Sequence, residues 1–315
     1  MIYTATLNPA IDLVIVTQSL EPNKVNRTQS FELQPNGKGV NVSFILKKLD
    51  VDSIATGIGG GFTLDFVRQG LKDKGIRELF LQVDEPTRVN VFTRVLNQGV
   101  EYKEVNPGPK INHELQKAYL KRLEDNLVEN DALVVSGSFS TGIDESYLVD
   151  ISMLCEAKKV KLIVDSSYPV VKDILKYHPF LLKPNDDELA SWFGINRKLS
   201  EVEIIHYAQK VVQQGCQNVL ISRGSEGAIL VSDDTILIGN APKIQVLNTA
   251  GAGDTMLGTF LGYLAKKQTK EQALKHAIAA GSDTASKTWL TDFENLDSLL
   301  DQIVIKKGSL EYAKV

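Results

Sequence analysis

The stretch NTAGAGD, residues 248–254, is the part of the chain around which the rest can be organised. It runs directly into residues 255–267, where apolar residues recur at the spacing of one helical face. Unpaired backbone N–H groups and the dipole at a helix start attract an anion, and glycine lets the backbone approach it closely. The same dipole favours an ionised Asp254, which can accept a proton. The pattern therefore predicts an anion site beside a carboxylate base, as phosphoryl transfer to a hydroxyl requires.

A simpler interpretation of this stretch stays open at the level of sequence. Short glycine motifs occur by chance, so residues 248–254 could be an ordinary turn. In that case Asp254 would be a residue that caps the helix, with no chemical role. The rest of the chain must decide between the two interpretations.

The composition is that of a mildly acidic globular protein. The 315 residues are 43% hydrophobic and 23% charged, with a net charge of −4. Such a chain can bury a large core, and its charge gives no support for nucleic-acid or anionic-membrane binding. Cys155 and Cys216 are the only cysteines, so neither a disulfide framework nor a zinc spacing is present. Because there is no basic N-terminal region and no apolar run of membrane-spanning length, we expect a cytoplasmic protein.

From residue 112 onward, helical patterns alternate with short apolar runs. This alternation predicts an α/β fold with a mostly parallel sheet and helices on both of its faces. Residues 227–231 and 235–238 are expected to add a late antiparallel hairpin. The expected parallel strands lie at residues 132–135, 162–164, 180–182 and 219–221.

The N-terminal part predicts further strands, turns and helices. Residues 87–96 and 100–105 form a hairpin, and with the early strands they could make a small sheet outside the main unit. No internal repeat or linker is present, so we expect one domain over residues 1–315, with a lid formed by about residues 12–34 and 87–106. The other predicted elements are strands at 2–7, 13–16, 25–33 and 53–58, turns at 34–39 and 59–61, and helices at 40–49 and 64–74, the second capped by Thr63.

Two familiar nucleotide-binding motifs are excluded. A Rossmann fingerprint needs its glycines directly after the first strand, but residues 8–12 read NPAID there. A Walker loop needs Ser or Thr after its lysine, but Gly39 follows Lys38, and its upstream glycine would fall at Glu32. A nicotinamide enzyme and a P-loop protein are therefore disfavoured.

Polar residues follow four of the predicted strands. In a parallel sheet, ligands bind beyond the carboxyl ends of the strands, so these residues could share one site. Ordinary turns and helix caps are the simple alternative for each segment taken singly. The segments are Ser136-Gly137-Ser138, Asp165-Ser166-Ser167, residues 183–188 (KPNDDE) and Ser222-Arg223-Gly224.

The motifs NPAID, NGKGVN, KPNDDE, SRGSEGA and NTAGAGDT occur in this order along nearly the whole chain. Together they resemble the ribokinase-like sugar kinases, also called the phosphofructokinase B family. VNR at 25–27, GGFT at 60–63, TRVNV at 87–91 and NPGP at 106–109 are most similar to the 1-phosphofructokinase branch, with tagatose-6-phosphate kinase as the nearest rival. Asn36 departs from the glycine usual in the family, and Phe139-Ser140 replaces a usual Leu-Pro.

The resemblance implies a ribokinase-like αβα sandwich with a small β-sheet lid that closes over the sugar and excludes water. It makes Asp254 the general base, with the turn Gly251-Ala252-Gly253 stabilising the transferred phosphoryl group. Arg27, Lys38 and Arg88 are candidate anchors for a phosphate on the sugar. The sugar-binding residues that it implies are Asp12, Gly37, Lys38, Gly39, Asn41, Asn90 and Ser138.

The resemblance also implies ATP and Mg²⁺. Asn185 and Glu188 could organise Mg²⁺ through water, although Glu188 could instead be a first-turn residue favoured by the helix dipole. Residues 277–281 could admit the adenine, or could serve close helix packing. The residues implied for the nucleotide are Lys183, Asn185, Ser222, Arg223, Gly224, Gly227 and Gly281.

The expected reaction is ATP-dependent phosphorylation of fructose 1-phosphate at its 6-hydroxyl, giving fructose 1,6-bisphosphate. The alternative is a tagatose-6-phosphate kinase that gives tagatose 1,6-bisphosphate. A non-catalytic regulator on the same fold would be expected to have lost the base, but Asp254 is present. Nucleic acid and membrane are not expected partners, and a homodimer through the lid is an open alternative to a monomer.

Overall fold

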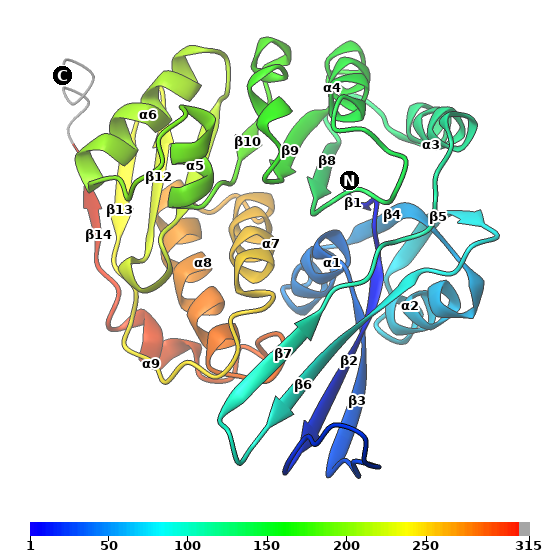
Figure 1. Cartoon of the computed structure of the whole chain (residues 1–315). Coiled ribbons are helices and arrows are strands. Elements are labelled where there is room, and N and C mark those ends of the chain that lie inside the picture. Colours follow the sequence, from blue (N-terminus) through cyan, green and yellow to red (C-terminus); the bar gives the residue numbers. More distant parts are fainter. Residues whose placement is uncertain (309–315) are drawn as a thin grey trace.

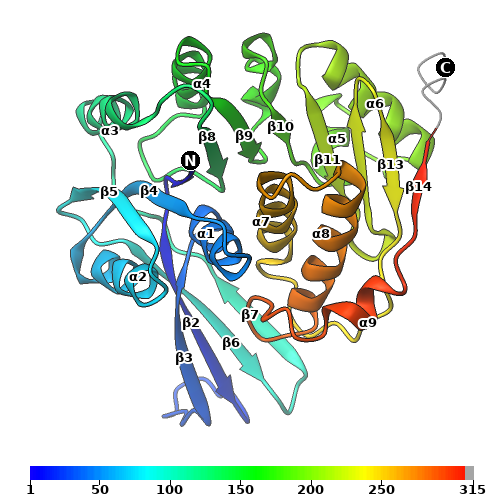
Figure 2. The ribbon, with the colours of Figure 1, turned by 180° about the vertical axis from the view of Figure 1, so that it is seen from behind.

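The computed structural model describes residues 1–308, so residues 309–315 of the expected domain lie outside the described part. Two sheets organise the molecule, one of ten strands and one of four (Figure 1). The large sheet has the strand order β14-β13-β12-β11-β10-β9-β8-β1-β4-β5. The small sheet has the order β3-β2-β6-β7 and projects from one side of the main body (Figures 1 and 2).

The large sheet is parallel from β5 to β11, and the last three strands at its other edge are antiparallel. The predicted α/β fold with a mostly parallel sheet is therefore confirmed, and the late hairpin is antiparallel as expected. The strands are β1 (Ile2–Thr6), β4 (Ser53–Gly60), β5 (Arg77–Val83), β8 (Ala132–Ser136), β9 (Lys161–Asp165), β10 (Leu181–Leu182), β11 (Asn218–Ser222), β12 (Ala228–Ser232), β13 (Ile236–Gly239) and β14 (Ile305–Lys307).

Helices cover both faces of the large sheet, because its central strands are apolar on both sides. On one face the core packs against α3 (His113–Asn126), α4 (Tyr147–Ala157), α5 (Asp186–Trp192) and α6 (Glu201–Gln213). The other face holds α1 (Lys38–Lys48), α2 (Gly61–Asp73), α7 (Ala252–Ala265), α8 (Lys270–Ala285) and α9 (Leu296–Leu300). Short 3₁₀ turns lie at Pro169–Lys172, Leu175–Tyr177 and Gly224–Glu226.

The small sheet consists of β2 (Ala10–Thr17), β3 (Ser30–Asn36), β6 (Arg88–Val95) and β7 (Val100–Glu104). Side chains alternate between the two faces of a strand, so its pairing register decides which residues share a face. Asp12 pairs with Gln34 and with Asn90, and these three polar residues therefore lie on one face. The small sheet thus presents a polar face toward the body and carries apolar residues on its outer face.

Several predicted boundaries in the N-terminal part are wrong. The strand expected at 25–33 is β3, which begins at Ser30 and continues through the predicted turn to Asn36 because it pairs with β2 along that length. Gly59 and Gly60 belong to β4, which pairs with β5 there, and helix α2 begins at Gly61. Thr63 is not the N-cap of α2; its hydroxyl donates to the carbonyl oxygen of Gly60 at 3.2 Å.

Two edge strands were absent from the sequence prediction, β5 and β14. β14 has only three residues and forms by pairing with β13, which is a long-range contact without a local signal. β5 has the sequence RELFLQV, in which polar and apolar residues do not alternate regularly. It forms by pairing in parallel with β4. Within residues 1–308, no helix is both long enough and apolar enough to cross a membrane.

Candidate active site

The turn before α7 has the conformation of a helix N-terminus that is open to an anion. Gly251 is the N-cap with φ 76, a left-handed conformation that glycine adopts at little cost, and no side chain caps the helix. Asp254, in the first turn, is 6% exposed and accepts a hydrogen bond from Nδ2 of Asn41 at 2.8 Å. Gly251 therefore caps α7, and the interpretation of Asp254 as the helix cap is wrong.

The electrostatic environment of Asp254 suits a base. Burial raises the pKa of Asp254 to about 6, with the positive charge of Lys38 opposing the shift and the carboxylate of Asp165 adding to it. A carboxylate with this pKa is mostly ionised at neutral pH and still has appreciable affinity for a proton. The site therefore holds a group that can accept a proton from a bound hydroxyl.

Two lysines converge on a buried carboxylate beside this turn. Asp165, at the end of β9, lies 3.2 Å from Nζ of Lys183 and 3.4 Å from Nζ of Lys38. Burial would raise the pKa of Asp165, but the two lysines lower it below its usual value. The same carboxylate raises the pKa of Lys38. A Cβ placed on Gly253 would lie 3.4 Å from Nζ of Lys183, so this ammonium group is next to the glycine turn.

Asp165 was noted in the sequence only as a polar residue at a strand end. Its contacts with Lys38 and Lys183 become visible because β9 and β10 are neighbours in the sheet and Lys38, the first residue of α1, reaches the carboxyl end of β9. The sequence signal for Asp165 is its position at the end of an apolar strand. Together the two lysines place positive charge beside the start of α7.

Gly37 and Gly39 hold the start of α1 against β1. Gly37 is the N-cap of α1 with φ 135, and a Cβ on Gly39 would lie 2.5 Å from Oγ1 of Thr6 and 2.9 Å from the carbonyl oxygen of Ala5. A larger side chain at position 39 would therefore push α1 away from the sheet. The close packing brings the side chains of Lys38 and Asn41 to Asp165 and Asp254.

The polar face of the small sheet contributes Asp12. Its Oδ1 accepts from Nδ2 of Asn90 at 2.8 Å, and its Oδ2 accepts a short hydrogen bond from Nδ2 of Asn36. Burial raises the pKa of Asp12, although both amides and the charge of Arg88 act in the opposite direction. Oδ1 of Asn36 accepts from Nδ2 of Asn41 at 3.0 Å. A chain of side-chain hydrogen bonds thus joins Asp12 to Asp254.

A cavity lies between the small sheet and the Gly251 turn, with this hydrogen-bonded chain on its wall. Three buried polar atoms of its lining residues have no hydrogen-bond partner among residues 1–308: Nε2 of Gln34, Oδ1 of Asn41 and Nε1 of Trp289. Buried polar atoms without partners are costly, so these atoms suit a polyhydroxyl ligand. The lining residues are Asp12, Val14, Gln34, Asn36, Asn41, Phe92, Arg94, Glu101, Lys103, Asn248, Ala250, Gly251, Trp289 and Leu290.

The predicted phosphate anchors do not all lie together. Arg88 is half-buried at the base of β6, and its Nη1 and Nη2 donate to the carbonyl oxygens of Asn106 at 3.3 Å and Asn8 at 3.2 Å. Burial lowers its pKa. Asn8 also donates to Oγ of Ser138 at 3.4 Å, which links Ser138 to the same region. Arg27 is exposed in the loop between β2 and β3 and does not line the cavity.

Two basic residues that line the cavity were missed by the sequence analysis. Arg94 and Lys103 lie on β6 and β7, on the polar face of the small sheet, and pair with the carboxylate of Glu101 at 3.2 Å and 3.1 Å. Nη2 of Arg94 also reaches the carbonyl oxygen of Leu247 at 3.5 Å, which links the small sheet to the segment before the glycine turn. No local motif marks them, since their position depends on strand register.

The residues expected at the nucleotide occupy the ends of β10 and β11. Oδ1 of Asn185 accepts from the backbone N–H of Glu188 at 2.7 Å, and Oε2 of Glu188 accepts from that of Asn185 at 2.9 Å. This reciprocal capping box accounts for both residues locally. Asn185 also forms a parallel bridge with Ser222, so the two strand ends are adjacent.

The next segment, residues 223–227, is a tight turn. Gly224 and Gly227 have φ 53 and φ 94, and a Cβ on Gly227 would lie 2.0 Å from the carbonyl oxygen of Gly239. The guanidinium of Arg223 pairs with Glu201 at 2.8 Å and forms a short contact with Glu226. These contacts shape the turn. They leave the proposed nucleotide contacts of Arg223, Gly224 and Gly227 as predictions.

Gly281 packs against the start of α7. A Cβ on Gly281 would lie 3.1 Å from the carbonyl oxygen of Ala252 and 3.5 Å from Cβ of Met256. Close packing of α8 on α7 therefore explains this small residue. Its proximity to the adenine stays a prediction.

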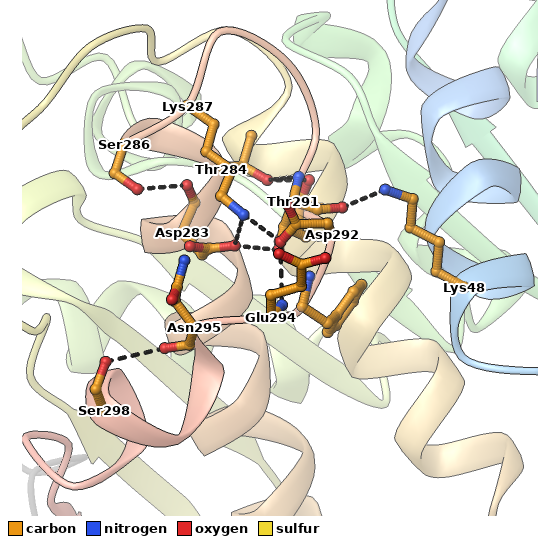
Figure 3. Close-up of polar contacts among 12 residues, drawn as sticks. Lys48, Asp283, Thr284, Ser286, Lys287, Thr291, Asp292, Glu294, Asn295 and Ser298 are labelled. Atoms are coloured by element: carbon orange, nitrogen blue, oxygen red, sulfur yellow. Dashed lines mark hydrogen bonds and ion pairs between the residues drawn. The ribbon is translucent and has the colours of Figure 1, made fainter.

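A polar network fixes the segment that follows α8 (Figure 3). Asp283 accepts a short hydrogen bond from Oγ1 of Thr291 and pairs with Nζ of Lys287 at 3.2 Å. The hydroxyl of Thr284 accepts from the backbone N–H of Thr291 at 3.0 Å, and Nζ of Lys48 donates to the carbonyl oxygen of Thr291. Since residues 289 and 290 lie within this segment, the network positions one wall of the cavity.

The start of α7 and Lys183 have the chemistry to bind the phosphates of a nucleoside triphosphate with Mg²⁺. The backbone N–H of Ala252 donates to the carbonyl oxygen of Thr249 at 3.3 Å, whereas those of Gly253 and Asp254 have no such partner within residues 1–308. These two amides and the ammonium group of Lys183 suit phosphate oxygens. Over the described residues, no group of three or more His, Cys, Asp or Glu side chains could hold a metal ion. Phosphate oxygens and water would therefore supply most ligands of a magnesium ion here, as is usual for Mg²⁺.

The fold and the family define a class of protein, an α/β carbohydrate kinase, in which a buried carboxylate lies in the first turn of the helix whose N-cap, Gly251, lines a polar cavity. Residues 4–293 match the family described as pfkB family carbohydrate kinase, and the chain belongs to that family.

Among named relatives, the chain is 41% identical to D-tagatose-1-phosphate kinase of Bacillus licheniformis, covering 97% of this chain and 99% of the relative. It is 32% identical to 1-phosphofructokinase of Bacillus subtilis, covering 98% and 100%. A structure of phosphofructokinase-2 from Escherichia coli in complex with substrates and products has a TM-score of 0.85 at 27% identity, covering 95% and 98%. Ribokinase of Thermotoga maritima shares the fold, with a TM-score of 0.74 at 19% identity and coverage of 96% and 99%.

Proposed function

We propose that this protein transfers the γ-phosphoryl group of ATP to the 6-hydroxyl of fructose 1-phosphate, giving fructose 1,6-bisphosphate and ADP. The observation that carries the proposal is Asp254, buried in the first turn of α7 with a pKa raised to about 6 and with two lysines nearby. Membership of the pfkB family supports a sugar as the acceptor.

In the proposed step, the 6-hydroxyl oxygen forms a bond to the γ-phosphorus, and the bond from that phosphorus to the β,γ-bridging oxygen breaks. Asp254 accepts the hydroxyl proton. The amides of Gly253 and Asp254 stabilise charge on the transferred group, the amide of Ala252 joins them in place of its bond to Thr249, and Lys183 adds a positive charge beside them. Mg²⁺ would neutralise charge on the nucleotide phosphates, with Asn185 and Glu188 as candidate contacts through water.

The far end of the sugar would carry the existing phosphate. Arg88 is the first candidate to bind it, because its buried Nε has no partner within the described chain and guanidinium groups suit phosphate. Lys38 lies at the start of α1, where an anion is also favoured. Arg94 and Lys103 add positive charge on the same face of the small sheet. Arg27 would need a movement of the β2–β3 loop, or a second copy of the chain, to take part.

A second candidate substrate is tagatose 1-phosphate, which would give tagatose 1,6-bisphosphate. Relatives at 41% and 38% identity are named D-tagatose-1-phosphate kinase, while those named 1-phosphofructokinase are 32% and 36% identical. Tagatose 1-phosphate therefore replaces tagatose 6-phosphate as the rival. Both candidates are ketohexoses with phosphate on C1 and the acceptor hydroxyl on C6.

The proposal gives the small sheet two roles, as a lid over the sugar and as the contact surface of a dimer. As a lid, the small sheet (β2, β3, β6 and β7) would close over the sugar, with Arg94 joining it to Leu247 on the body in the closed form. As a dimer contact, its outer face would pair with a second copy, since Phe31, Leu33 and Tyr102 are exposed there. Free, buried cysteines at 155 and 216 support a cytoplasmic location.

The test is ATP consumption by the purified protein with fructose 1-phosphate, tagatose 1-phosphate, fructose 6-phosphate, tagatose 6-phosphate and fructose, each over a concentration series. The expected result is a kcat/KM for a ketohexose 1-phosphate that exceeds the others. Asp254→Asn should fold normally, bind ATP and lose turnover by roughly two to four orders of magnitude. A preference for a 6-phosphate, or near-normal turnover of Asp254→Asn, would contradict the proposal.

A further inference from the structure

Asn36 occupies the middle of the hydrogen-bonded chain on the cavity wall. Its Nδ2 donates to Oδ2 of Asp12, and its Oδ1 accepts from Nδ2 of Asn41 at 3.0 Å and from the backbone N–H of Gly37 at 2.5 Å. Both ends of one amide are therefore used to join the small sheet to helix α1. Removing this side chain would leave Asp12 and Asn41 each short of a partner.

The same side chain fixes which polar atoms face the cavity. Because Nδ2 of Asn41 donates to both Asn36 and Asp254, Oδ1 of Asn41 is left buried and without a partner in residues 1–308. Nε2 of Gln34, two residues before Asn36 on β3, is buried without a partner as well. One acceptor and one donor are thus held ready on either side of Asn36 for hydroxyl groups of a ligand.

The place of Asn36 along the bound sugar is inferred from its order in the hydrogen-bonded chain that starts at Asp254. In the proposed reaction the 6-hydroxyl lies at Asp254, and Asn41 and Asn36 are the first and second residues away from Asp254 along the hydrogen-bonded chain. In a ketohexofuranose the hydroxyl on C4 is the ring hydroxyl nearest to C6. Fructose and tagatose differ only in the configuration at C4. The side chains next to the base are therefore those that meet the epimeric hydroxyl.

We propose that Asn36 is a specificity-determining residue that reads the configuration of the C4 hydroxyl of the ketohexose 1-phosphate. It acts by fixing the orientation of the Asn41 amide and the Asp12 carboxylate, which then accept the hydroxyl of one epimer in better geometry than that of the other. This inference rests on the proposed function, because it assumes that C6 lies at Asp254.

The experiment compares kcat/KM for fructose 1-phosphate and tagatose 1-phosphate in the wild type and in Asn36→Ala. The ratio of the two values is the readout, since a general loss of structure or of catalysis lowers both values together and leaves the ratio unchanged. Asn36→Ser is the second variant, which keeps a short hydroxyl to reach Asp12. Gln29→Ala is the matched control. Gln29 directly precedes β3, and its side-chain amide donates to Gln18 at the surface, away from the cavity.

We expect Asn36→Ala to move the wild-type ratio toward one by about 3- to 12-fold, as for loss of one hydrogen bond. Asn36→Ser should retain part of the preference, and Gln29→Ala should match the wild type. A ratio unchanged within twofold in both Asn36 variants would overturn the specificity role while leaving the proposed function intact. If the wild type phosphorylates neither sugar 1-phosphate, both proposals fail. A wild type that does not discriminate between the two sugars would overturn the specificity role alone.

Discussion

At the scale of single residues, the pKa of Asp254 results from opposing effects. Burial raises it, and the positive charge of Lys38 lowers it. Lys38 is itself held by Asp165, a carboxylate that is 1% exposed and shared with Lys183. A change at any member of this group should therefore change the proton affinity of the base.

The pH dependence of turnover follows from this arrangement. In the proposed reaction Asp254 must be deprotonated, so kcat/KM should reach its plateau about one pH unit above 6 and should fall as the pH is lowered through about 6, the pKa of Asp254 in the free protein. Lys38→Met removes a charge that lowers this pKa, so the acidic limb of the kcat/KM–pH profile should move to higher pH. Lys47→Met, on the same helix but paired with Asp52 at the surface, should leave the limb in place. A limb that stays in place in Lys38→Met would show that Lys38 does not tune the base.

Arg88 gives a second prediction at this scale. It is half-buried near Asp12, with a buried Nε that lacks a partner in the described part of the chain. A charge-assisted hydrogen bond to phosphate contributes roughly 1.5–3 kcal/mol, so Arg88→Ala should lower kcat/KM for the sugar 1-phosphate about 10- to 200-fold. The loss with unphosphorylated fructose should be much smaller. Equal losses with the two sugars would mean that Arg88 does not bind the phosphate.

At the scale of elements, helix α7 determines the geometry of the site because it carries the glycine turn and Asp254. It packs between α1 and α8, and glycines allow the close approach on both sides. A Cβ on Gly258 would lie 2.8 Å from Cβ of Ile45 and 3.2 Å from the carbonyl oxygen of Val42. On the α8 side, Gly281 lies under Ala252. The approach of α1 to α7 is what brings Asn41 to the carboxylate of Asp254.

Gly258→Ala should therefore destabilise the protein, by roughly 1–3 kcal/mol in the free energy of unfolding, because Ile45 and the backbone of α1 must move. Gly262→Ala is the matched control within the same helix. Its Cβ would meet the end of the flexible Leu49 side chain, with Cδ1 at 2.7 Å, so the variant should stay within about 1 kcal/mol of the wild type. Chemical denaturation measures both. Equal stability of the two variants would argue against a tight α1–α7 contact.

At the scale of the whole molecule, the two sheets meet at the cavity. The large sheet supplies charged strand ends and the α7 turn, while the small sheet supplies the Asp12 face and covers the cavity. Helix α2 covers the end of the outer face near Ile11 and Pro35, and within residues 1–308 the remainder of that face is uncovered. Phe31 is 68% exposed there, Tyr102 is 49% exposed and Leu33 is 43% exposed. An apolar sheet face of this kind is a good surface for self-association.

The wild-type protein should therefore sediment as a dimer in analytical ultracentrifugation. Phe31→Glu places a charge in the apolar face and should shift the equilibrium to monomer, lowering the sedimentation coefficient. Val128→Glu is the control, an equally simple change at an exposed apolar residue in the loop between α3 and β8. A monomeric wild type, or a Phe31→Glu variant that remains dimeric, would contradict association through this face.

The local sequence determined the fold class and the helix start that carries Asp254. Apolar runs that alternate with helical periodicity predicted the parallel sheet, because strand and helix periods are local properties. The turn at 248–254 predicted a helix start with Asp254 in its first turn, since glycine and helix periodicity act over a few residues. Strand boundaries near Gly59 and Gln34 could not be predicted, because pairing with a neighbouring strand overrode the turn propensity of glycine and proline.

Only the tertiary structure decided which side chains meet. Asp165, Lys183 and Lys38 come from β9, the end of β10 and α1, and their contact depends on strand order and helix placement. The Asn36 bridge from Asp12 to Asn41 depends on the register of β3 against β2, and a shift of one residue would turn Asn36 to the outer face. Register and strand order are set by packing of the whole core, and for that physical reason the site's full membership cannot be read from local sequence.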